Sequence, residues 1–409
     1  MRSPVREYLG IECDGEDSYE TMMTVHFNAD LRPVVKDRVG MLHWIMDPAA
    51  SGFIIGYDLS GNQVLISNFD SKKHPVASWD EGLCHEVVTA AIGQDVPFQV
   101  LSYRPWILSR KVAKQYHSGN VFLAGDAAHS FPPTGGLGLN SGIADAHNLA
   151  YKIAAVHQGW GGKALLESYG AERRHVAEVN SKQSVKNGQK IFAFLKAVGL
   201  AGIDDEQQAR ENLLKSIHDS SKQDMIKANV EAQREHFDNL ELHIGYVYGS
   251  ERTPDHASYY TPKFEAGARL PHAWIKIRNP GTTPSLDPVD VSYVTEFTED
   301  DVVSRQYSIL DLCALQSFTL LVGNSSSWNE RFKNLEQMAA QAGIKLRMYA
   351  ADTDFEFVFD NQYQLFGNGA GFAHGGGLLV RPDQHILTRA AADTSAEYLW
   401  DELRRHLSV

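Results

Sequence analysis

The segment from Gly119 to Lys152 constrains the fold of this chain more than any other. It reads GNVFLAGDAAHSFPPTGGLGLNSGIADAHNLAYK. An apolar run, predicted to be a buried strand, ends at Gly125-Asp126, a loop rich in Pro and Gly follows, and helical periodicity begins near Asn140. Such a junction gathers backbone N–H groups and the positive end of a helix dipole at one point. The segment therefore predicts an α/β fold with a site for an anion or a developing negative charge.

Residue types within this segment suggest separate roles. Asp126, at the predicted strand end, is a candidate acceptor for a sugar or ribityl hydroxyl, although an Asp capping a turn gives the same local pattern. Pro132 and Pro133 stiffen the loop. Glycines let backbone approach a flat ring closely at Gly135, Gly136 and Gly138. His129 fits either a contact to cofactor or substrate or a loop histidine bonded to backbone.

This segment resembles the second FAD-binding signature of the para-hydroxybenzoate hydroxylase family of flavin-dependent aromatic hydroxylases. In that family a Gly-Asp pair ends a strand, and a Pro-Pro-Thr-Gly-x-x-Gly-x-Asn loop runs under the flavin ring. The resemblance implies that Asp126 binds the ribityl chain and that Pro133 lies beside the flavin C4a, at the catalytic position. The implied cofactor-binding residues are Gly125, Asp126, Pro133, Gly135, Gly138, Leu139 and Asn140, the last three facing the N1 and C2 carbonyl edge.

The resemblance also implies an activity. Members of the family use NAD(P)H and O2, and a flavin C4a-hydroperoxide transfers a hydroxyl group to a phenolic or polycyclic aromatic ring. The sequence does not choose between NADH and NADPH, nor does it name the ring. The implied partners are a small aromatic molecule, O2 and a second copy of the chain in a homodimer. The alternative, from a different functional class, is a non-catalytic remnant that acts as a structural or dimerisation module.

Three parts are predicted along the chain. Residues 1–200 form a partial FAD-binding and substrate domain with an antiparallel meander from Thr21 to about Asp70 and a helix from about Trp79 to Ile92. Residues 201–262 form a helical extension, which reaches about Leu242, and a connector, and the stretch GARLPHAWIKIRNPGTTPSLDP also reads as a boundary or connector. The final third predicts a strand, a helix and a strand, then a strand hairpin and a helix. Residues 263–409 contain FEAGARLPHAWI, FTLLVG and LLVRPDQHILTR, which, like LLESYGAERRHVAEVN, resemble the phenol hydroxylase and 2,4-dichlorophenol hydroxylase branch. That branch has a thioredoxin-like C-terminal domain. Because this part lacks Cys-x-x-Cys, we expect a structural or dimerising role.

The start of the chain differs from the family pattern. Its first residues, MRSPVREYLG, match a segment that follows an Asp-Gly motif in complete members, and no Gly-x-Gly-x-x-Gly with strand and helix context precedes them. GNGAGF, from Gly367 to Phe372, is predicted to lie in a loop. We therefore expect a fold that lacks the N-terminal Rossmann βαβ unit. A truncated gene model or an alternative start explains this pattern, and a genuine short form is the other interpretation.

Substrate contacts are predicted on the antiparallel sheet. Inward positions are assigned by alternation along the strands to His43, Ile45, Phe53, Ile55 and Tyr57. Tyr103 and Trp106, which precede the Gly-Asp segment, are further candidates for the ring pocket. The same pattern also fits an ordinary packed core, so both interpretations remain open.

Charge and cysteine content exclude several other classes. The net charge of −13 and the absence of clustered Lys and Arg argue against nucleic-acid binding. The three cysteines, Cys13, Cys84 and Cys313, lie far apart and form no zinc or dithiol motif, so no metal site is predicted and a reducing cytoplasm is expected. No apolar run has the length of a membrane helix or a signal peptide, so no membrane association is expected.

Overall fold

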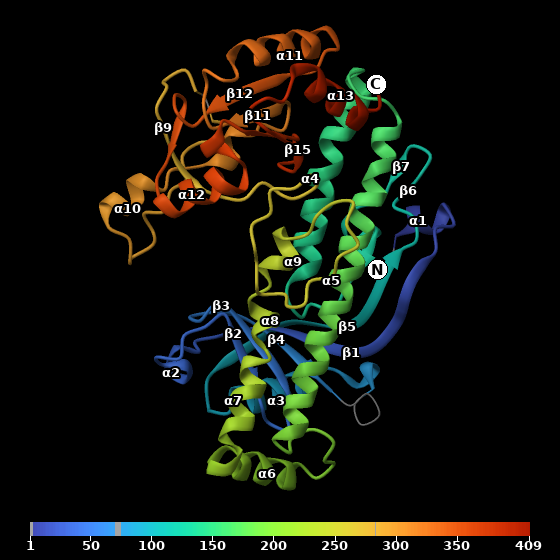
Figure 1. Ribbon diagram of the computed structural model, residues 1–409. Helices are drawn as coiled ribbons and strands as arrows, with labels where there is room; N and C mark the ends of the chain where they lie inside the picture. Colours follow the sequence, from blue (N-terminus) through green and yellow to red (C-terminus); the bar gives the residue numbers. More distant parts are fainter. Residues whose placement is uncertain (1–2, 70–74, 283) are drawn as a thin grey trace.

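The computed structural model describes residues 3–69, 75–282 and 284–409. Two parts that contain β-sheets lie at opposite ends of an elongated molecule, and two long helices run between them (Figure 1). These helices, α4 (Leu137–Gln158) and α5 (Ala164–Ala197), pack against each other. At the level of a mixed α/β fold, the sequence-based prediction is confirmed.

The N-terminal part is built on an antiparallel sheet. Among the described residues it has six strands in the order β2-β3-β4-β1-β5-β8. The strands are β1 (Cys13–Ala29), β2 (Leu42–Ile45), β3 (Gly52–Asp58), β4 (Asn62–Asn68), β5 (Phe98–Ala113) and β8 (His129–Ser130). Strands β2, β3 and β4 form the predicted meander, whereas β1 pairs with β4 and β5 rather than with β2. Two short helices, α1 (Pro4–Tyr8) and α2 (Arg32–Val35), flank β1 in the sequence.

Helix α3 (Glu81–Ile92) covers one face of this sheet, close to the helix predicted for residues 79–92. Asp80 caps its start by accepting a hydrogen bond from the Leu83 N–H at 2.9 Å, and Gly93 ends it in the left-handed conformation. The core between helix and sheet includes Met23, Val25, Phe27, Ile54, Leu65, Cys84 and Val88. The opposite face of the sheet looks toward α5 and the loop that precedes α4.

Helix α4 is oriented differently from the prediction. The sequence pattern predicted a buried apolar stripe of Ile143, Ala146, Leu149, Ala150 and Ile153. Leu149 is buried, but Ile143 is 60% exposed and Ile153 is 45% exposed, while Ala146 and Ala150 are also exposed. The buried face of α4 instead carries the polar residues Ser141, Asp145, Asn148 and Lys152. Polar groups tolerate burial when they are hydrogen-bonded, and these four find partners on α5 or beyond it.

The helical region continues past α5, as predicted to about Leu242. The further helices are α6 (Glu206–His218), α7 (Gln223–Glu231), α8 (Arg234–Phe237) and α9 (Leu240–Ile244). In Figure 1, α6 and α7 lie at the same end of the molecule as the N-terminal sheet, and α9 lies alongside α4 and α5. The four-residue helix α8 contacts α5 close to that sheet.

The C-terminal part contains a sheet in the order β12-β11-β14-β15, with β11 parallel to β12 and the other pairs antiparallel. Its elements are β11 (Phe318–Val322), α11 (Asn329–Gln341), β12 (Leu346–Ala350), α12 (Asp360–Gly369), β14 (Gly377–Val380), β15 (Ile386–Ala390) and α13 (Ala396–Leu407). The predicted strand–helix–strand followed by hairpin–helix is confirmed. GNGAGF begins inside the last turns of α12 rather than in a loop.

Two segments correct the sequence-based predictions. The stretch read as a connector contains β9 (Trp274–Ile277), the middle strand of a small sheet with β10 (Tyr307–Ser308) and β13 (Phe355–Phe357), because its Ile275 fills the C-terminal core. The remaining short helix there is α10 (Glu299–Ser304). The apolar run after Gly119 forms only the short β7 (Val121–Phe122), which pairs with β6 (His117–Ser118) alone among the described residues.

Within the described part of the chain, no helix combines the length and the apolar character needed to cross a bilayer.

Candidate active site

The Gly125-Asp126 pair lies in a single 3-10 turn, Gly125–Ala127, that follows β7. Gly125 has a φ of +56°, which glycine adopts without strain. The turn packs against α4, where a Cβ atom on Gly142 would lie only 3.1 Å from the Gly125 Cα. Glycine at both positions therefore allows the turn to approach the helix.

Asp145, on the buried face of α4, fixes this turn in place. Its carboxylate accepts hydrogen bonds from the Gly125 N–H at 3.1 Å, from His129 Nε2 at 2.8 Å and from Arg173 Nε at 2.8 Å. Burial alone would raise the pKa of Asp145, but the bond from His129 and the charge of Arg173 lower it below its ordinary value. The turn thus rests on an ionised, fully buried carboxylate.

Asp126 differs sharply from Asp145, although it stands one residue after the same glycine. Its side chain is exposed, and among the described residues its carboxylate makes no hydrogen bond or ion pair. The backbone beneath it is held firmly, because Arg6 donates to the Ala127 carbonyl at 2.9 Å. Asp126 is therefore a rigidly presented acceptor that is available to a ligand hydroxyl.

The loop before α4 is hydrogen-bonded to α5 and to the segment after α8. Thr134 Oγ1 donates to the Ser184 carbonyl at 2.5 Å, and Asn239 Nδ2 donates to the Gly135 carbonyl at 2.8 Å. Gly135 has a φ of +101°, and a Cβ there would lie 3.0 Å from Asn187 Nδ2. Only glycine fits this position without strain and crowding.

The first turn of α4 leaves its N–H groups open. Gly136 is the N-cap residue, with a φ of +63°, and no side chain caps the helix. Asn140 donates back to the Gly136 carbonyl at 2.8 Å and so does not satisfy these donors. Leu139 is 77% exposed, which shows that the turn faces outward. Free N–H groups at the start of a 22-residue helix favour negative charge.

These features fit the flavin half of FAD. A ribityl chain requires a hydrogen-bond acceptor, which the exposed carboxylate offers. A flavin ring requires a backbone surface that it can approach closely, which the glycine-containing loop offers, and its ring edge requires donors, which the uncapped helix N–H groups offer. The adenine half has no matching element among the described residues, where no Gly-x-Gly-x-x-Gly connects a strand to a helix. We refer to the residues from Gly125 to Asn140, which fit the flavin half of FAD, as the flavin half-site.

An apolar cavity of about 750 Å³ opens beside this loop, between Pro132–Thr134, α5 and the sheet face that α3 leaves uncovered. Five neighbouring strands from β2 to β5 contribute to its wall, and four strand spacings of about 4.8 Å give a width of about 19 Å. The apolar lining includes Met22, Leu42, Trp44, Phe53, Ile55, Ile66, Leu108, Ile191, Phe192 and Leu195. The volume lies within the usual range for small-molecule sites.

The strand register corrects the predicted face of two substrate candidates. His43 lies opposite Ile54, and Tyr103 lies opposite Val25. Directly paired residues project to the same side of a sheet, and both Ile54 and Val25 belong to the core under α3. His43 and Tyr103 therefore project to the face away from the cavity. Alternation predicted which residues share a face within one strand, but it could not relate one strand to the next.

The other candidates divide into two groups. Pro133, Phe53 and Ile55 line the cavity, and Ile45 borders it although it also packs against the core under α3. Trp106 lies opposite Met22 and packs against the cavity-side cluster without reaching the lining, and Tyr57 is 62% exposed beyond it. His129, whose role was left open, bonds to Asp145 rather than to backbone.

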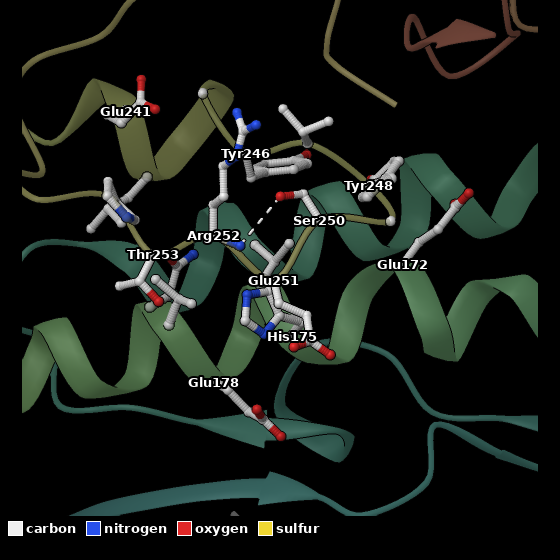
Figure 2. A pocket seen from close by; sticks show the side chains of 18 of the residues that line it. Glu172, His175, Glu178, Glu241, Tyr246, Tyr248, Ser250, Glu251, Arg252 and Thr253 are labelled. Atoms are coloured by element: carbon white, nitrogen blue, oxygen red, sulfur yellow. Dashed lines mark hydrogen bonds between the residues drawn. The ribbon is translucent and has the colours of Figure 1, made fainter. Parts of the chain in front are cut away.

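Figure 2 shows a second cavity, which lies between α5 and the segment from Glu241 to Lys263 and has a volume of about 820 Å³. Charged residues line it, including Glu178, Glu251 and Arg252, whose N–H donates to Ser250 at 3.3 Å. Its described lining includes no residue between 125 and 140. A charged groove remote from the loop does not suit an apolar ring, so the apolar cavity is the better candidate.

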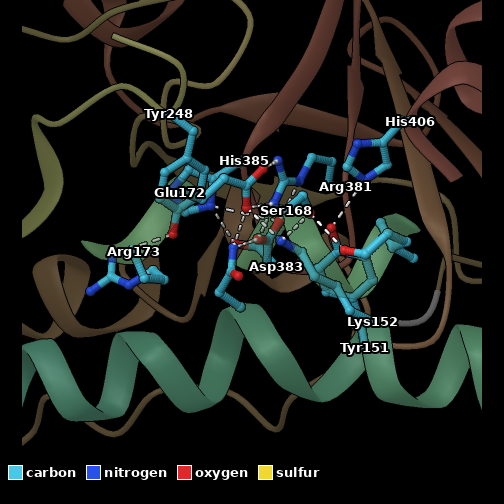
Figure 3. A network of polar contacts seen from close by, with 12 residues as sticks. Tyr151, Lys152, Ser168, Glu172, Arg173, Tyr248, Arg381, Asp383, His385 and His406 are labelled. Carbon is cyan, nitrogen blue, oxygen red and sulfur yellow. Dashed lines mark hydrogen bonds and ion pairs between the residues drawn. The ribbon is translucent and has the colours of Figure 1, made fainter. Parts of the chain in front are cut away.

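A buried charge network connects the long helices to the C-terminal part (Figure 3). Arg381 donates to Glu172 at 2.7 and 2.9 Å and to Asp383 at 2.6 and 3.0 Å. Lys152 also donates to Glu172, at 2.7 Å, and Asn148 donates to Asp383 at 3.0 Å. The sequence favours a structural turn at Arg381, Pro382 and Asp383, but nothing in it indicates that Arg381 pairs with Glu172, 209 residues away.

The comparisons with known proteins agree with this geometry. Residues 1–184 match the family model described as an FAD binding domain. The chain is 38% identical to a putative polyketide hydroxylase from Streptomyces halstedii, over 100% of this chain and 66% of that protein. It is 30% identical to tetracenomycin B2 monooxygenase-dioxygenase from Streptomyces olivaceus, over 97% of this chain and 62% of that protein. The chain thus spans about two thirds of the length of these curated relatives.

Solved structures share the fold over the whole chain. The flavin-dependent monooxygenase PieE, in complex with FAD and substrate, has a TM-score of 0.82 and 24% identity, covering 100% of this chain and 69% of PieE. Aklavinone-11 hydroxylase, in a ternary complex with FAD and aklavinone, has a TM-score of 0.71 and 25% identity, covering 100% and 66%. Residues 1–184 therefore belong to the FAD binding domain family, and the whole chain is similar in sequence to polyketide hydroxylases and in fold to flavin-dependent monooxygenases.

Proposed function

We propose that this protein hydroxylates a phenolic or polycyclic aromatic ring, using FAD with NAD(P)H and O2. The observation that carries the proposal is that Pro133 lies both in the loop of the flavin half-site and in the wall of the apolar cavity. A flat ring in this cavity would be held against the sheet on one side and would face the loop on the other. The apolar lining would keep water from the ring.

The residues of the chain would divide the binding of FAD between them. Asp126 would accept hydrogen bonds from the ribityl hydroxyls, and the open N–H groups at Gly138 and Leu139 would donate to the N1 and C2 carbonyl edge of the ring. When bound, FAD would supply the redox chemistry that links NAD(P)H to O2. The helix dipole of α4 would favour negative charge at that ring edge.

A substrate with several fused rings is supported more strongly than a single phenol. The cavity extends across five strands, which exceeds the size of one ring. Relatives are named for tetracenomycin B2 and for a polyketide, and a solved neighbour holds aklavinone. A relative named for a single-ring phenol, 2,4-dichlorophenol, comes from Delftia acidovorans and has a lower identity, 28% over 100% of this chain and 68% of that protein.

The test is product formation with isotopically labelled O2. The purified chain is incubated with FAD, NADH or NADPH, and a fused-ring phenol such as 2-naphthol, and the product is analysed by mass spectrometry. We expect consumption of NAD(P)H that depends on FAD, with one labelled oxygen in the product. Consumption without labelled product, or no consumption at saturating FAD, would contradict the proposal and would favour the alternative of a structural or dimerisation module.

We propose a thioredoxin-like domain for residues 263–409, after a partial FAD-binding and substrate domain (1–200) and a helical connector (201–262). The order β12-β11-β14-β15 and the flanking helices support it. We also propose that this domain stabilises a homodimer. A chain that ends at residue 262 should lose dimerisation or solubility in light scattering, and a soluble dimer of that shortened chain would contradict the proposal. The three free cysteines support a location in the reducing cytoplasm.

A further inference from the structure

His236, on the short helix α8, is a polar side chain in the largely apolar wall of the cavity. Aromatic neighbours fix its ring. Trp44 meets it edge to face with ring centroids 5.8 Å apart, and Phe237 stacks on it at 4.5 Å. Since Trp44 also lines the cavity, the imidazole lies at the β2 end of the space in which a substrate would sit.

The Nδ1 atom of the His236 ring is buried and has no hydrogen-bond partner among the described residues. Buried polar atoms are nearly always paired, because they have given up their bonds to water. Two hydroxyl groups of this wall are hydrogen-bonded within the protein: Thr134 donates to the Ser184 carbonyl, and Ser184 Oγ donates to the Asn180 carbonyl at 3.1 Å. Among the described lining residues, His236 is the one with a buried side-chain nitrogen or oxygen that has no partner.

Helix α8 also holds a fixed position relative to the flavin half-site. Glu235, next to His236, is buried, accepts the Ala257 N–H at 3.0 Å and pairs with Lys190. Asn239, two residues after the helix, holds the Gly135 carbonyl. The segment that presents His236 is thus hydrogen-bonded to the loop that would carry the flavin. The fold therefore sets the distance between the imidazole and this loop.

The protonation state of His236 limits what it can recognise. Burial lowers the pKa of His236 to about 4, so the ring is neutral at neutral pH. A neutral imidazole offers one N–H donor and one acceptor nitrogen. That combination matches a phenolic hydroxyl or a ring carbonyl, and it offers no charge to a carboxylate or an ammonium group.

We propose that His236 is a specificity-determining residue that forms a hydrogen bond with a hydroxyl or carbonyl group of the aromatic substrate. The proposal rests on the proposed function, because it assumes that aromatic rings occupy this cavity. It adds the requirement that the ring carry an oxygen substituent toward the β2 end. Glu16 and Arg110, which lie on β1 and β5, border the other end of the cavity.

The experiment measures binding without turnover, by isothermal titration of 2-naphthol and of 2-methylnaphthalene, in which a methyl group replaces the hydroxyl. We expect His236→Phe, which keeps an aromatic ring against Phe237, to weaken binding of 2-naphthol about tenfold and to leave 2-methylnaphthalene unchanged. His236→Asn should bind 2-naphthol more tightly than His236→Phe. His175→Phe, in the wall of the second cavity, is the matched control and should change neither affinity.

Two results would overturn the role of His236 alone: an unchanged affinity of His236→Phe for 2-naphthol, or an equal loss for both ligands, which would indicate packing rather than a hydrogen bond. In both cases the unmodified chain still binds the two rings, so the proposed function stands. If the unmodified chain binds neither ligand, the aromatic cavity itself is refuted, and the role of His236 falls with it. Thermal unfolding of each variant by circular dichroism verifies that it is folded.

Discussion

Replacing Asp145 with Asn removes a negative charge from the point where the Gly125 turn, His129 and Arg173 meet. The Arg173 guanidinium is fully buried, so in the variant its charge would face a neutral amide with no access to water. Removing one partner of a buried ion pair costs about 3–5 kcal/mol. Asn keeps the volume and one acceptor oxygen, so the loss comes from the charge rather than from a cavity. We expect the free energy of unfolding to fall by about 3–5 kcal/mol.

The assay is urea unfolding followed by tryptophan fluorescence, with Asp126→Asn as the matched control. This control makes the same chemical change one residue after Gly125, but on a side chain that is exposed and has no described partner. Exposed substitutions of this kind change stability by no more than about 0.5 kcal/mol. The two variants therefore separate a carboxylate that holds the turn from one that is presented to a ligand.

A second variant isolates the buried charge. Asp145→Asn combined with Arg173→Met removes both members of the pair, and we expect it to recover part of the lost stability because no unpaired charge remains. The reasoning is refuted if Asp145→Asn unfolds within about 0.5 kcal/mol of the unmodified chain. It is equally refuted if Asp126→Asn is as unstable as Asp145→Asn.

Three further predictions concern the flavin half-site, the network between the two parts, and pH. Asp126→Ala should weaken FAD binding about tenfold or more, measured by quenching of flavin fluorescence, because a hydrogen bond to a charged acceptor is lost; an unchanged affinity would contradict the site. Arg381→Met removes the arginine partner of the buried Asp383 carboxylate and leaves Glu172 paired with Lys152 alone, so it should lower the free energy of unfolding by about 3–5 kcal/mol, with hydrogen exchange rising first in residues 263–409; equal exchange throughout the chain would contradict the network. Burial lowers the pKa of His236 to about 4 and that of His406 to about 3, from 6.5. The unfolded chain therefore binds more protons between these values, so the contribution of both residues to stability is complete above pH 6.5 and is lost as the pH falls toward 4. Denaturant titrations that show constant stability from pH 7 to pH 5 would contradict this assignment.

The local features of the half-site could be predicted from the sequence because they depend on neighbouring residues. Gly125 and Gly135 both have a positive φ, which favours glycine. The helix after the loop begins within three residues of the predicted start. The strands of the meander could be predicted for the same reason, since alternation and turn residues act over short distances. The face that each strand presents depends on pairing between strands, and His43 shows where alternation alone fails.

The residues that hold the half-site in place could not be predicted. Asp145 lies in the Gly119–Lys152 segment and Arg173 lies in LLESYGAERRHVAEVN, but nothing in either segment indicates that the two residues, 28 positions apart on different helices, form an ion pair. The apolar periodicity of α4 was misleading because the buried face of this helix is polar. Ile143 and Ile153 contribute to the apolar pattern in the sequence, but both side chains are exposed. Burial of polar groups depends on partners that only the tertiary structure brings together.

The most direct test of the central claim is equilibrium dialysis of the chain against a large excess of FAD, with the bound flavin measured by its absorbance. The account predicts that the unmodified chain binds flavin at one site and that Asp126→Asn binds less while remaining folded. It also predicts that 2-naphthol in the apolar cavity perturbs the spectrum of the bound flavin, because Pro133 belongs to both sites. Absence of bound flavin in the unmodified chain, or equal binding by Asp126→Asn, would contradict it.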